Sequence, residues 1–150
     1  MKGFLIDTNI LSHLAPGRKQ ANPGVLSWVG ERGNEGEIWI SAMSVAEIDQ
    51  GVRKLQRRGD AARAELLGGW LEELVHVFGE QVLPMDTSVA RHLGRLSELV
   101  TAKGRHPGLA DLVIAATAAA YDLTLVTDNT RHFELLGLRL MSSSALGVRE

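Results

Sequence analysis

The sequence predicts an α/β fold, in which a parallel sheet of about five strands is flanked by helices on both faces. Two patterns alternate along the 150 residues: short apolar runs and longer stretches with helical spacing of apolar side chains. Strands that are apolar throughout are typical of a parallel sheet covered on both faces. We expect one domain over residues 1–150, with a tail that frays from about residue 142.

The predicted strands are five apolar runs, each too short to be read as a helix. They are Phe4–Ile6, Ile38–Ile40, Val82–Met85, Leu123–Val126 and Leu138–Met141. A loop is predicted at Gly33–Glu37, before the second run. Because helical stretches separate the runs, consecutive strands are joined by crossovers, which is the connection that a parallel sheet requires.

Helical spacing fills the intervals between these runs. The predicted helices carry the apolar sets Leu26 and Val29; Val45, Ile48, Val52 and Leu55; Leu66, Leu67, Trp70, Leu71, Leu74 and Val75; and Val89, Leu93, Leu96 and Val100. A turn at Arg57–Asp60 separates the second set from the third. The last helix, Leu109–Tyr121, is rich in alanine, and Pro107 is expected in its first turn.

The composition excludes several kinds of chemistry. There is no cysteine, which removes disulfides, thiolate nucleophiles and cysteine-bound zinc. The net charge is −2, so a nucleic-acid partner would require a local basic patch, a bound metal or another protein. The first apolar run is too short for a signal peptide, and the longest, Leu112–Tyr121, is too short to span a membrane. We therefore expect a cytoplasmic protein with no membrane segment.

Acidic side chains follow several of the predicted strands. Asp7 follows the first apolar run, and Glu47 lies past the second, in the first turn of the next helix. Asp111 is near the start of the alanine-rich helix, and Asp128 and Asn129 directly follow the fourth run. Strand carboxyl ends and helix amino ends meet at one edge of an α/β sheet, where such proteins form their sites. The sequence therefore predicts an acidic rim.

Each of these residues also has a purely structural interpretation. Asp7 is a good helix N-cap, and Ser44–Glu47 fits the capping-box pattern, in which Glu47 would bond to the Ser44 amide. Asp111 suits a helix dipole, and Asp128–Asn129 is ordinary turn chemistry. The functional interpretation depends on all four segments reaching the same rim. Several carboxylates held together repel one another unless a cation neutralises them, and oxygen-only ligands suit Mg²⁺ or Mn²⁺.

Four segments carry a family resemblance, and they occur in order along nearly the whole chain. They are Asp7–Ser12, Ser44–Ile48 with Gly51, Leu109–Ala118 and Leu125–Phe133. With these segments the chain resembles the PIN-domain ribonucleases, and most closely the VapC/FitB-like toxins of type II toxin–antitoxin systems. The resemblance implies a PIN-like fold and a divalent-metal-dependent endoribonuclease that hydrolyses RNA phosphodiester bonds.

The resemblance also implies roles for individual residues. Asp7, Glu47 and Asp111 match the acidic metal positions, with Asp7 and Asp111 as direct ligands of Mg²⁺ or Mn²⁺. Glu47 would bind the metal through water or orient the nucleophilic water. Thr8 and Thr127 match polar residues that support such a site.

The last motif departs from the family pattern. Asn129 stands where a fourth acid is found, and Asp128 occupies the position before it. Asp128 is a further candidate catalytic residue if it turns inward, whereas Asn129 would hold a water or an acid by hydrogen bonding. Arg131 is the best-placed single residue to meet an RNA phosphate.

Partners follow from the resemblance as well. It implies a homodimer, an RNA substrate and a cognate antitoxin that obstructs the site, with an antitoxin arginine as a suitable partner for the acids. DNA would be contacted only through the antitoxin.

The remaining charged residues have structural as well as functional interpretations. Arg53, Lys54, Arg57 and Arg58 form either a solvated helix face or a phosphate-contacting edge near Glu47. The histidines form no zinc-type pair and are expected at the surface or in loops: His13, His76, His92, His106 and His132.

Two alternative functions remain open at this point. The first is a catalytically silent PIN domain that acts only by binding, which Asn129 keeps in consideration. The second is a receiver-type phosphotransfer module with Asp86 as the phosphoacceptor. The second is weakened because the first strand offers a single acid, Asp7.

Overall fold

The computed structural model describes residues 3–18 and 22–146. Within them, five parallel strands form one sheet in the order β3-β2-β1-β4-β5. The strands are β1 (Phe4–Ile6), β2 (Ile38–Ser41), β3 (Val82–Leu83), β4 (Thr124–Thr127) and β5 (Leu140–Ser142). The predicted fold class, a five-stranded parallel sheet between helices, is confirmed.

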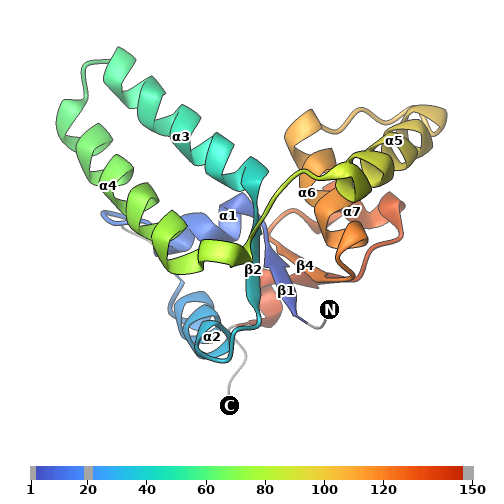
Figure 1. The fold of residues 1–150 in the computed structure, drawn as a ribbon, viewed down its shortest axis with the longest axis horizontal. Coiled ribbons are helices and arrows are strands. Elements are labelled where there is room, and N and C mark those ends of the chain that lie inside the picture. Colours follow the sequence, from blue (N-terminus) through green and yellow to red (C-terminus); the bar gives the residue numbers. More distant parts are fainter. Residues whose placement is uncertain (1–2, 19–21, 147–150) are drawn as a thin grey trace.

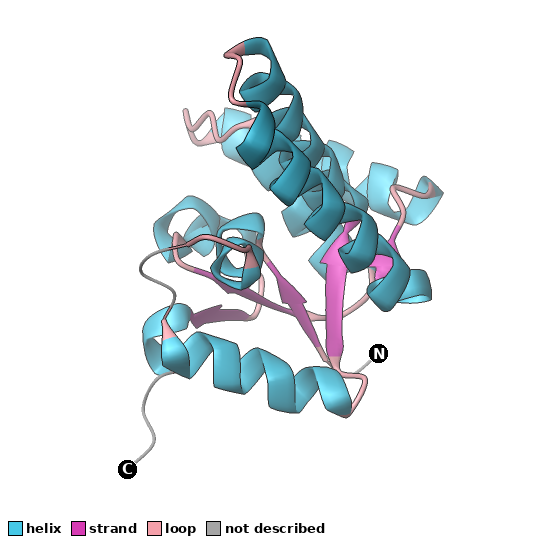
Figure 2. Ribbon diagram, turned by 90° about the vertical axis from the view of Figure 1, so that its left-hand side faces the viewer, coloured by secondary structure: helices cyan, strands magenta, loops and turns pink. Residues whose placement is uncertain are grey.

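Helices connect the strands and cover the sheet on both sides (Figure 2). They are α1 (Thr8–Leu11), α2 (Pro23–Asn34), α3 (Ala42–Arg57), α4 (Ala61–Phe78), α5 (Thr87–Ala102), α6 (Leu109–Ala120) and α7 (Thr130–Phe133). The α3–α4 pair and the α5–α6 pair diverge above the carboxyl ends of the strands (Figure 1). Among the described residues, no helix is both long and apolar enough to cross a membrane.

Side-chain alternation along the strands divides the core in two. Leu5 and Leu125 face the cluster formed with α5 and α6. Their neighbours Ile6 and Val126 face the opposite cluster, with α1, α2 and α4. All four are fully buried, which is why these strands contain no polar alternation.

The paired register places the ends of β1 and β4 side by side. Leu5 pairs with Trp39 of β2 on one side and with Leu125 of β4 on the other. Ile6 pairs with Val126, so the residues that follow both strands emerge together.

Several predicted boundaries differ from the structure. The third strand ends at Leu83 rather than Met85, because Pro84 has no N–H to give to a ladder and Met85 is half exposed. Helix α6 begins at Leu109 with Gly108 as its N-cap, so Pro107 precedes the helix instead of lying in its first turn. Helix α2 continues to Asn34, into the predicted loop at Gly33–Glu37.

The tail is ordered further than expected. Ser142 ends β5, where it pairs with Thr127, and a 3₁₀ turn follows at Ser143–Ala145. Leu146 is only 6% exposed and packs in the cluster with α2. Fraying from residue 142 is therefore wrong up to Leu146, because an apolar anchor closes this end of the core; residues 147–150 lie outside the described part of the chain.

Gly3 provides a test of this packing. It has a φ of +147°, and a Cβ added there would lie 2.7 Å from the Glu37 carbonyl oxygen. We expect Gly3→Ala to lower the free energy of unfolding by about 1–3 kcal/mol, because both the backbone and the contact are strained. Chemical denaturation measures this loss.

The matched control is Gly30→Ala in helix α2, where no atom lies within 4 Å of the added Cβ. It should raise the same free energy by about 0.5–1 kcal/mol, since alanine is the better helix former. Equal effects of the two substitutions would contradict the packing described at Gly3.

Candidate active site

The sheet has a topological switch point between β1 and β4. From β1 the chain builds outward to β2 and β3, then returns to add β4 and β5 on the other side of β1. Open α/β sheets bind ligands outside the carboxyl ends of the strands at such a point. Asp7 directly follows β1, and Thr127 is the last residue of β4. The geometry of the sheet therefore places these two residues at the expected position of a site.

Asp7 is held by both of its carboxylate oxygens. Oδ1 accepts from the Thr8 amide at 2.8 Å, and Oδ2 accepts from the Thr127 hydroxyl at 2.7 Å. The residue is 4% exposed and is also the N-cap of α1. Capping and a role in the site are thus compatible in Asp7.

Glu47 is connected to Asp7 through Thr8. The Thr8 hydroxyl lies 2.6 Å from Glu47 Oε1 and 2.8 Å from the hydroxyl oxygen of Ser44. Helix α3 begins at Ala42 with Ser41 as its N-cap, so Glu47 lies in the second turn, not the first. The predicted capping box at Ser44–Glu47 is therefore wrong, and both side chains are directed to Thr8 instead.

Asp111 lies in the first turn of α6, as expected, and its side chain is 29% exposed. Its Oδ2 lies 3.0 Å from Nδ1 of His132, which comes from α7. Asp111 is thus more open to solvent than Asp7.

The three acids act on one another electrostatically. Burial raises the pKa of the Asp7 carboxyl, and the negative charges of Asp111 and Glu47 raise that pKa further. The hydrogen bonds from Thr127 and from the Thr8 amide lower it in part. The structure therefore brings Asp7, Glu47 and Asp111 together in an arrangement whose negative charge is not fully compensated.

This donor set fits a hard divalent cation. All three acids offer oxygen, and a desolvated carboxylate with two acidic neighbours favours a cation beside it. In the described part of the chain, no three His, Asp or Glu side chains converge closely enough to enclose an ion by themselves. Water would have to complete the coordination, which is how Mg²⁺ is commonly bound.

The structure places Asp128 and Asn129 differently from the three acids. Asp128 is exposed, and its Oδ2 lies 3.4 Å from Nε2 of His13. Asn129 donates its backbone N–H to the Thr127 hydroxyl at 3.0 Å. Because that hydroxyl in turn donates to Asp7, Asn129 supports the site through its backbone N–H rather than through its side-chain amide.

Three residues near the site have contacts that the sequence did not indicate. Ser44 is fully buried against Thr8, His132 contacts Asp111, and His13 contacts Asp128. His13 is 8% exposed, which corrects the expectation that the histidines lie at the surface or in loops. Ser44 could have been found, because it lies one helical turn before Glu47; nothing in the sequence pairs either histidine with its acid.

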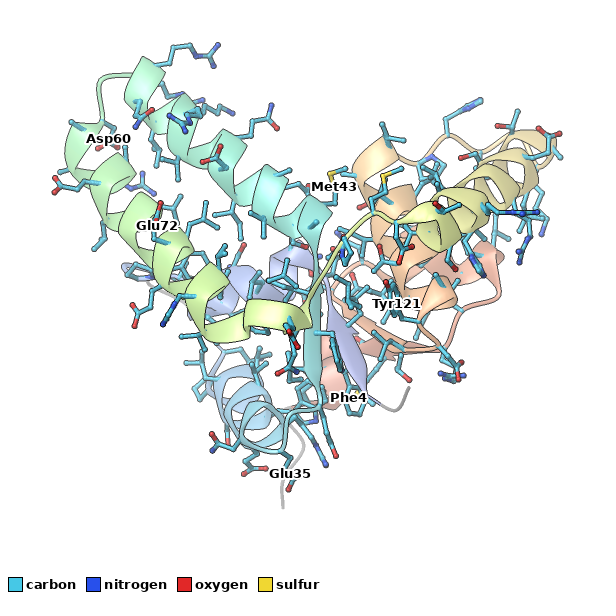
Figure 3. The ribbon with its side chains drawn as sticks, viewed as in Figure 1. Phe4, Glu35, Met43, Asp60, Glu72 and Tyr121 are labelled. Carbon is cyan, nitrogen blue, oxygen red and sulfur yellow. The ribbon has the colours of Figure 1, made fainter. Side chains whose placement is uncertain are left out.

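The basic residues considered as phosphate contacts lie in different parts of the structure. Arg131 borders a cavity that Asp111 also lines. Arg57 and Arg58 lie at the tip of the α3–α4 pair, beside Asp60 and at the opposite end of α3 from Met43 (Figure 3). Arg53 pairs with Asp49 at 3.6 Å. These positions fit a solvated helix face better than a phosphate-contacting edge near Glu47.

Asp86 is committed to local structure. It caps α5 by accepting from the Val89 amide, and it accepts a hydrogen bond from the Tyr121 hydroxyl. It follows β3, which is an edge strand, whereas the switch point lies two strands away. This position removes the geometric basis for a receiver-type phosphoacceptor.

Comparison with known proteins agrees with this geometry. The family profile of the PIN domain matches residues 4–137. The chain belongs to the PIN-domain family. This PIN domain is 32% identical to the toxin FitB of Neisseria gonorrhoeae over 87% of its own length and 90% of that protein's. It is 30% identical to the VapC ribonuclease Y4jK of Sinorhizobium fredii, over 93% and 96% of the two lengths.

The fold is similar to a solved structure as well. The structure of FitAB bound to IR36 DNA contains a chain that matches with a TM-score of 0.80 and 28% identity. The match covers 98% of this PIN domain and 97% of that chain.

Asp7 yields a prediction about stability. Its raised pKa means that the folded protein holds this proton more tightly than the unfolded chain, whose Asp titrates near pH 4. The contribution of Asp7 to stability is therefore greatest at acid pH and falls as pH rises through the folded-state pKa. In EDTA, we therefore expect the Tm of Asp7→Asn to increase relative to that of the wild type as the pH rises from about 4 to neutral, by roughly 3 °C.

The asparagine oxygen can still accept from the Thr8 amide, and its NH₂ can donate to the second lone pair of the Thr127 hydroxyl, but the Thr127 O–H loses its acceptor. This loss does not depend on pH, so the pH dependence of the difference isolates the charge of Asp7. Thermal melts from about pH 4 to about pH 8 measure the difference from wild type. Glu98→Gln, an exposed change on α5, is the control. A pH-independent difference between wild type and Asp7→Asn would refute the electrostatic account.

Proposed function

We propose that this PIN domain is the toxin of a toxin–antitoxin pair and that it cleaves RNA as an endoribonuclease dependent on Mg²⁺ or Mn²⁺. The observation that carries the proposal is the buried Asp7 at the switch point, whose pKa is raised by its burial and by Asp111 and Glu47. The names of the relatives, a toxin and a ribonuclease, point to the same activity.

The roles of the residues follow from their surroundings. Asp7 and Asp111 would hold the metal, which when bound would activate water and stabilise the leaving oxygen of the phosphodiester. Thr127 and the Thr8 amide orient the Asp7 carboxylate, and the Thr8 hydroxyl orients Glu47. Glu47 is therefore positioned to orient a water. Asp128, which is exposed beside His13, has a smaller role in this proposal.

The expected substrate is single-stranded or looped RNA in the cytoplasm, because exposed loops present accessible phosphates and unstacked bases. The expected partners are a second copy of the chain and an antitoxin. A cationic antitoxin side chain would neutralise the acids that surround Asp7. The FitAB relative is bound to DNA, and by analogy we assign DNA contact to the antitoxin.

Cleavage of a pool of labelled RNAs tests the enzyme. Wild type should cut with Mg²⁺ or Mn²⁺ and not with EDTA. Asp7→Asn and Asp111→Asn should each lose at least about 100-fold in rate, because each removes a charged metal ligand. Asp128→Asn should lose less than about tenfold.

Asp7→Asn also controls for contaminating ribonuclease. Binding of RNA without metal-dependent cleavage by antitoxin-free protein would favour the silent binding domain. A loss in Asp128→Asn equal to that in Asp7→Asn would instead place Asp128 in the metal site.

Growth tests the toxin assignment. Expression of wild type without its antitoxin should arrest growth, and Asp7→Ala at equal protein level should relieve the arrest. The reason is that the arrest requires RNA cleavage and Asp7 is its central ligand. Colony counts and an immunoblot measure the outcome; an arrest that persists in Asp7→Ala would refute the link between toxicity and the site.

A further inference from the structure

A cavity of about 330 Å³ opens beside Asp111, and none of its lining residues comes from helix α3, which carries Glu47. It lies between the loop that joins α5 to α6 and helix α7. Arg105 and His106 line it from the loop, and Arg131 and His132 from α7. Asp111 therefore borders both this cavity and the acidic site. A cavity of this size is at the lower end of those that hold small organic ligands.

The two arginines of the cavity form no ion pair with any acid that the structure describes. Within residues 3–18 and 22–146, neither Arg105 nor Arg131 forms an ion pair, although Arg32, Arg53, Arg63 and Arg139 do. The protein as a whole carries a net charge of −2, whereas this cavity presents two guanidinium groups that form no ion pair with a described residue. Guanidinium groups bind phosphate oxygens well, often through two hydrogen bonds.

The remaining lining is apolar or aromatic. Pro107 and Leu135 contribute to the wall, and Leu135 is 37% exposed although it is a large apolar side chain. The imidazole of His106 lies next to Pro107 in the sequence and is exposed. Rings and guanidinium planes of this kind stack on unpaired RNA bases. The cavity thus combines groups for a phosphate with groups for a base.

We propose that this cavity is a nucleotide subsite, which holds the RNA nucleotide next to the scissile phosphate with its phosphate on Arg105 and Arg131 and its base against His106, Pro107 and Leu135. The proposal rests on the proposed ribonuclease function. Because Asp111 borders both places, a strand whose scissile phosphate reaches the acids has its neighbouring nucleotide at the cavity. This subsite would select RNA in which that nucleotide is unstacked.

Kinetics on a short synthetic RNA, centred on the strongest cut that wild type makes in an RNA pool, test the phosphate contact. Arg105→Ala should raise KM by about tenfold and leave kcat nearly unchanged, because it removes a charged contact to the bound strand. Arg95→Ala is the matched control: Arg95 is also exposed and lines a different cavity, near the other end of α6. It should leave KM unchanged.

Binding of the same RNA to Asp7→Asn in EDTA gives a readout without turnover. Adding Arg105→Ala should reduce the slope of log K against log salt by about 0.7, the value for one lost phosphate contact on a single strand. Adding Arg95→Ala should leave the slope unchanged.

Abasic substitutions test the base contact. An abasic residue at one position beside the cut should weaken binding to Asp7→Asn by about tenfold, and His106→Ala should remove most of this penalty. Abasic residues elsewhere should have little effect.

The subsite proposal would be overturned if the wild type cleaves RNA while Arg105→Ala and Arg95→Ala have the same KM and the same salt dependence of binding. It would also be overturned if the abasic penalty does not depend on His106. Failure of wild type to cleave any RNA with metal would instead refute the proposed function. In that case, binding that depends on Arg105 and His106 would still support a nucleotide site. A further outcome is that inorganic phosphate displaces the RNA equally well from the His106→Ala variant and from its parent, and that no abasic penalty is seen. This result would identify the cavity as a phosphate site alone and would refute the base contact.

Discussion

The pairing of β1 with β4 is the constraint on which the site depends. The Asp7 amide donates to the Val126 carbonyl at 2.9 Å, which extends the ladder by one bond past the end of β1. This bond brings Asp7 beside Thr127, whose hydroxyl fixes the carboxylate. The strand order puts both residues at the switch point, where open α/β sheets form their sites. A slip of one residue would turn Asp7 toward a different face and separate it from Thr127.

Burial of the Asp7 carboxylate works against folding and in favour of cation binding. Removing a carboxylate from water is unfavourable, and two neighbouring acids make its ionised form more unfavourable still. The two hydrogen bonds to Asp7 offset only part of this effect. The rest can be relieved by a bound metal or by a cationic group of a partner. Stability lost at a functional residue is a common compromise between folding and activity.

The acids around Asp7 and the arginines of the cavity lie next to each other. Asp111 joins them, since it belongs to the acidic cluster and also borders the cavity of Arg105 and Arg131. An acidic protein that acts on RNA must overcome general repulsion from its substrate. A metal at the acids and two guanidinium groups beside them, which form no ion pair with a described residue, would meet this requirement locally.

The sequence by itself determined the fold class, and it identified Asp7, Glu47 and Asp111 as acids that would lie at one edge of the sheet. Apolar runs without alternation required a sheet covered on both faces, and the position of Asp7 after the first run placed it at the sheet edge. Local patterns misjudged the details that depend on distant partners. Ser44–Glu47 has the letters of a capping box, but the helix starts earlier, at Ala42, because Ser41 caps it, and both side chains meet Thr8 from another element.

Only the tertiary structure decided the partners of Asp128, Asn129 and the histidines. His13 and Asp128 are 115 positions apart, and His132 and Asp111 are 21 apart, so neither contact follows from a local period. Likewise, the loop residue Arg105 reaches the same cavity as Arg131 only because helix α7 meets the start of α6, where His132 contacts Asp111. Spacing along a chain specifies which face of an element a side chain occupies; which distant group it meets depends on strand order and crossovers, which bring separate segments together.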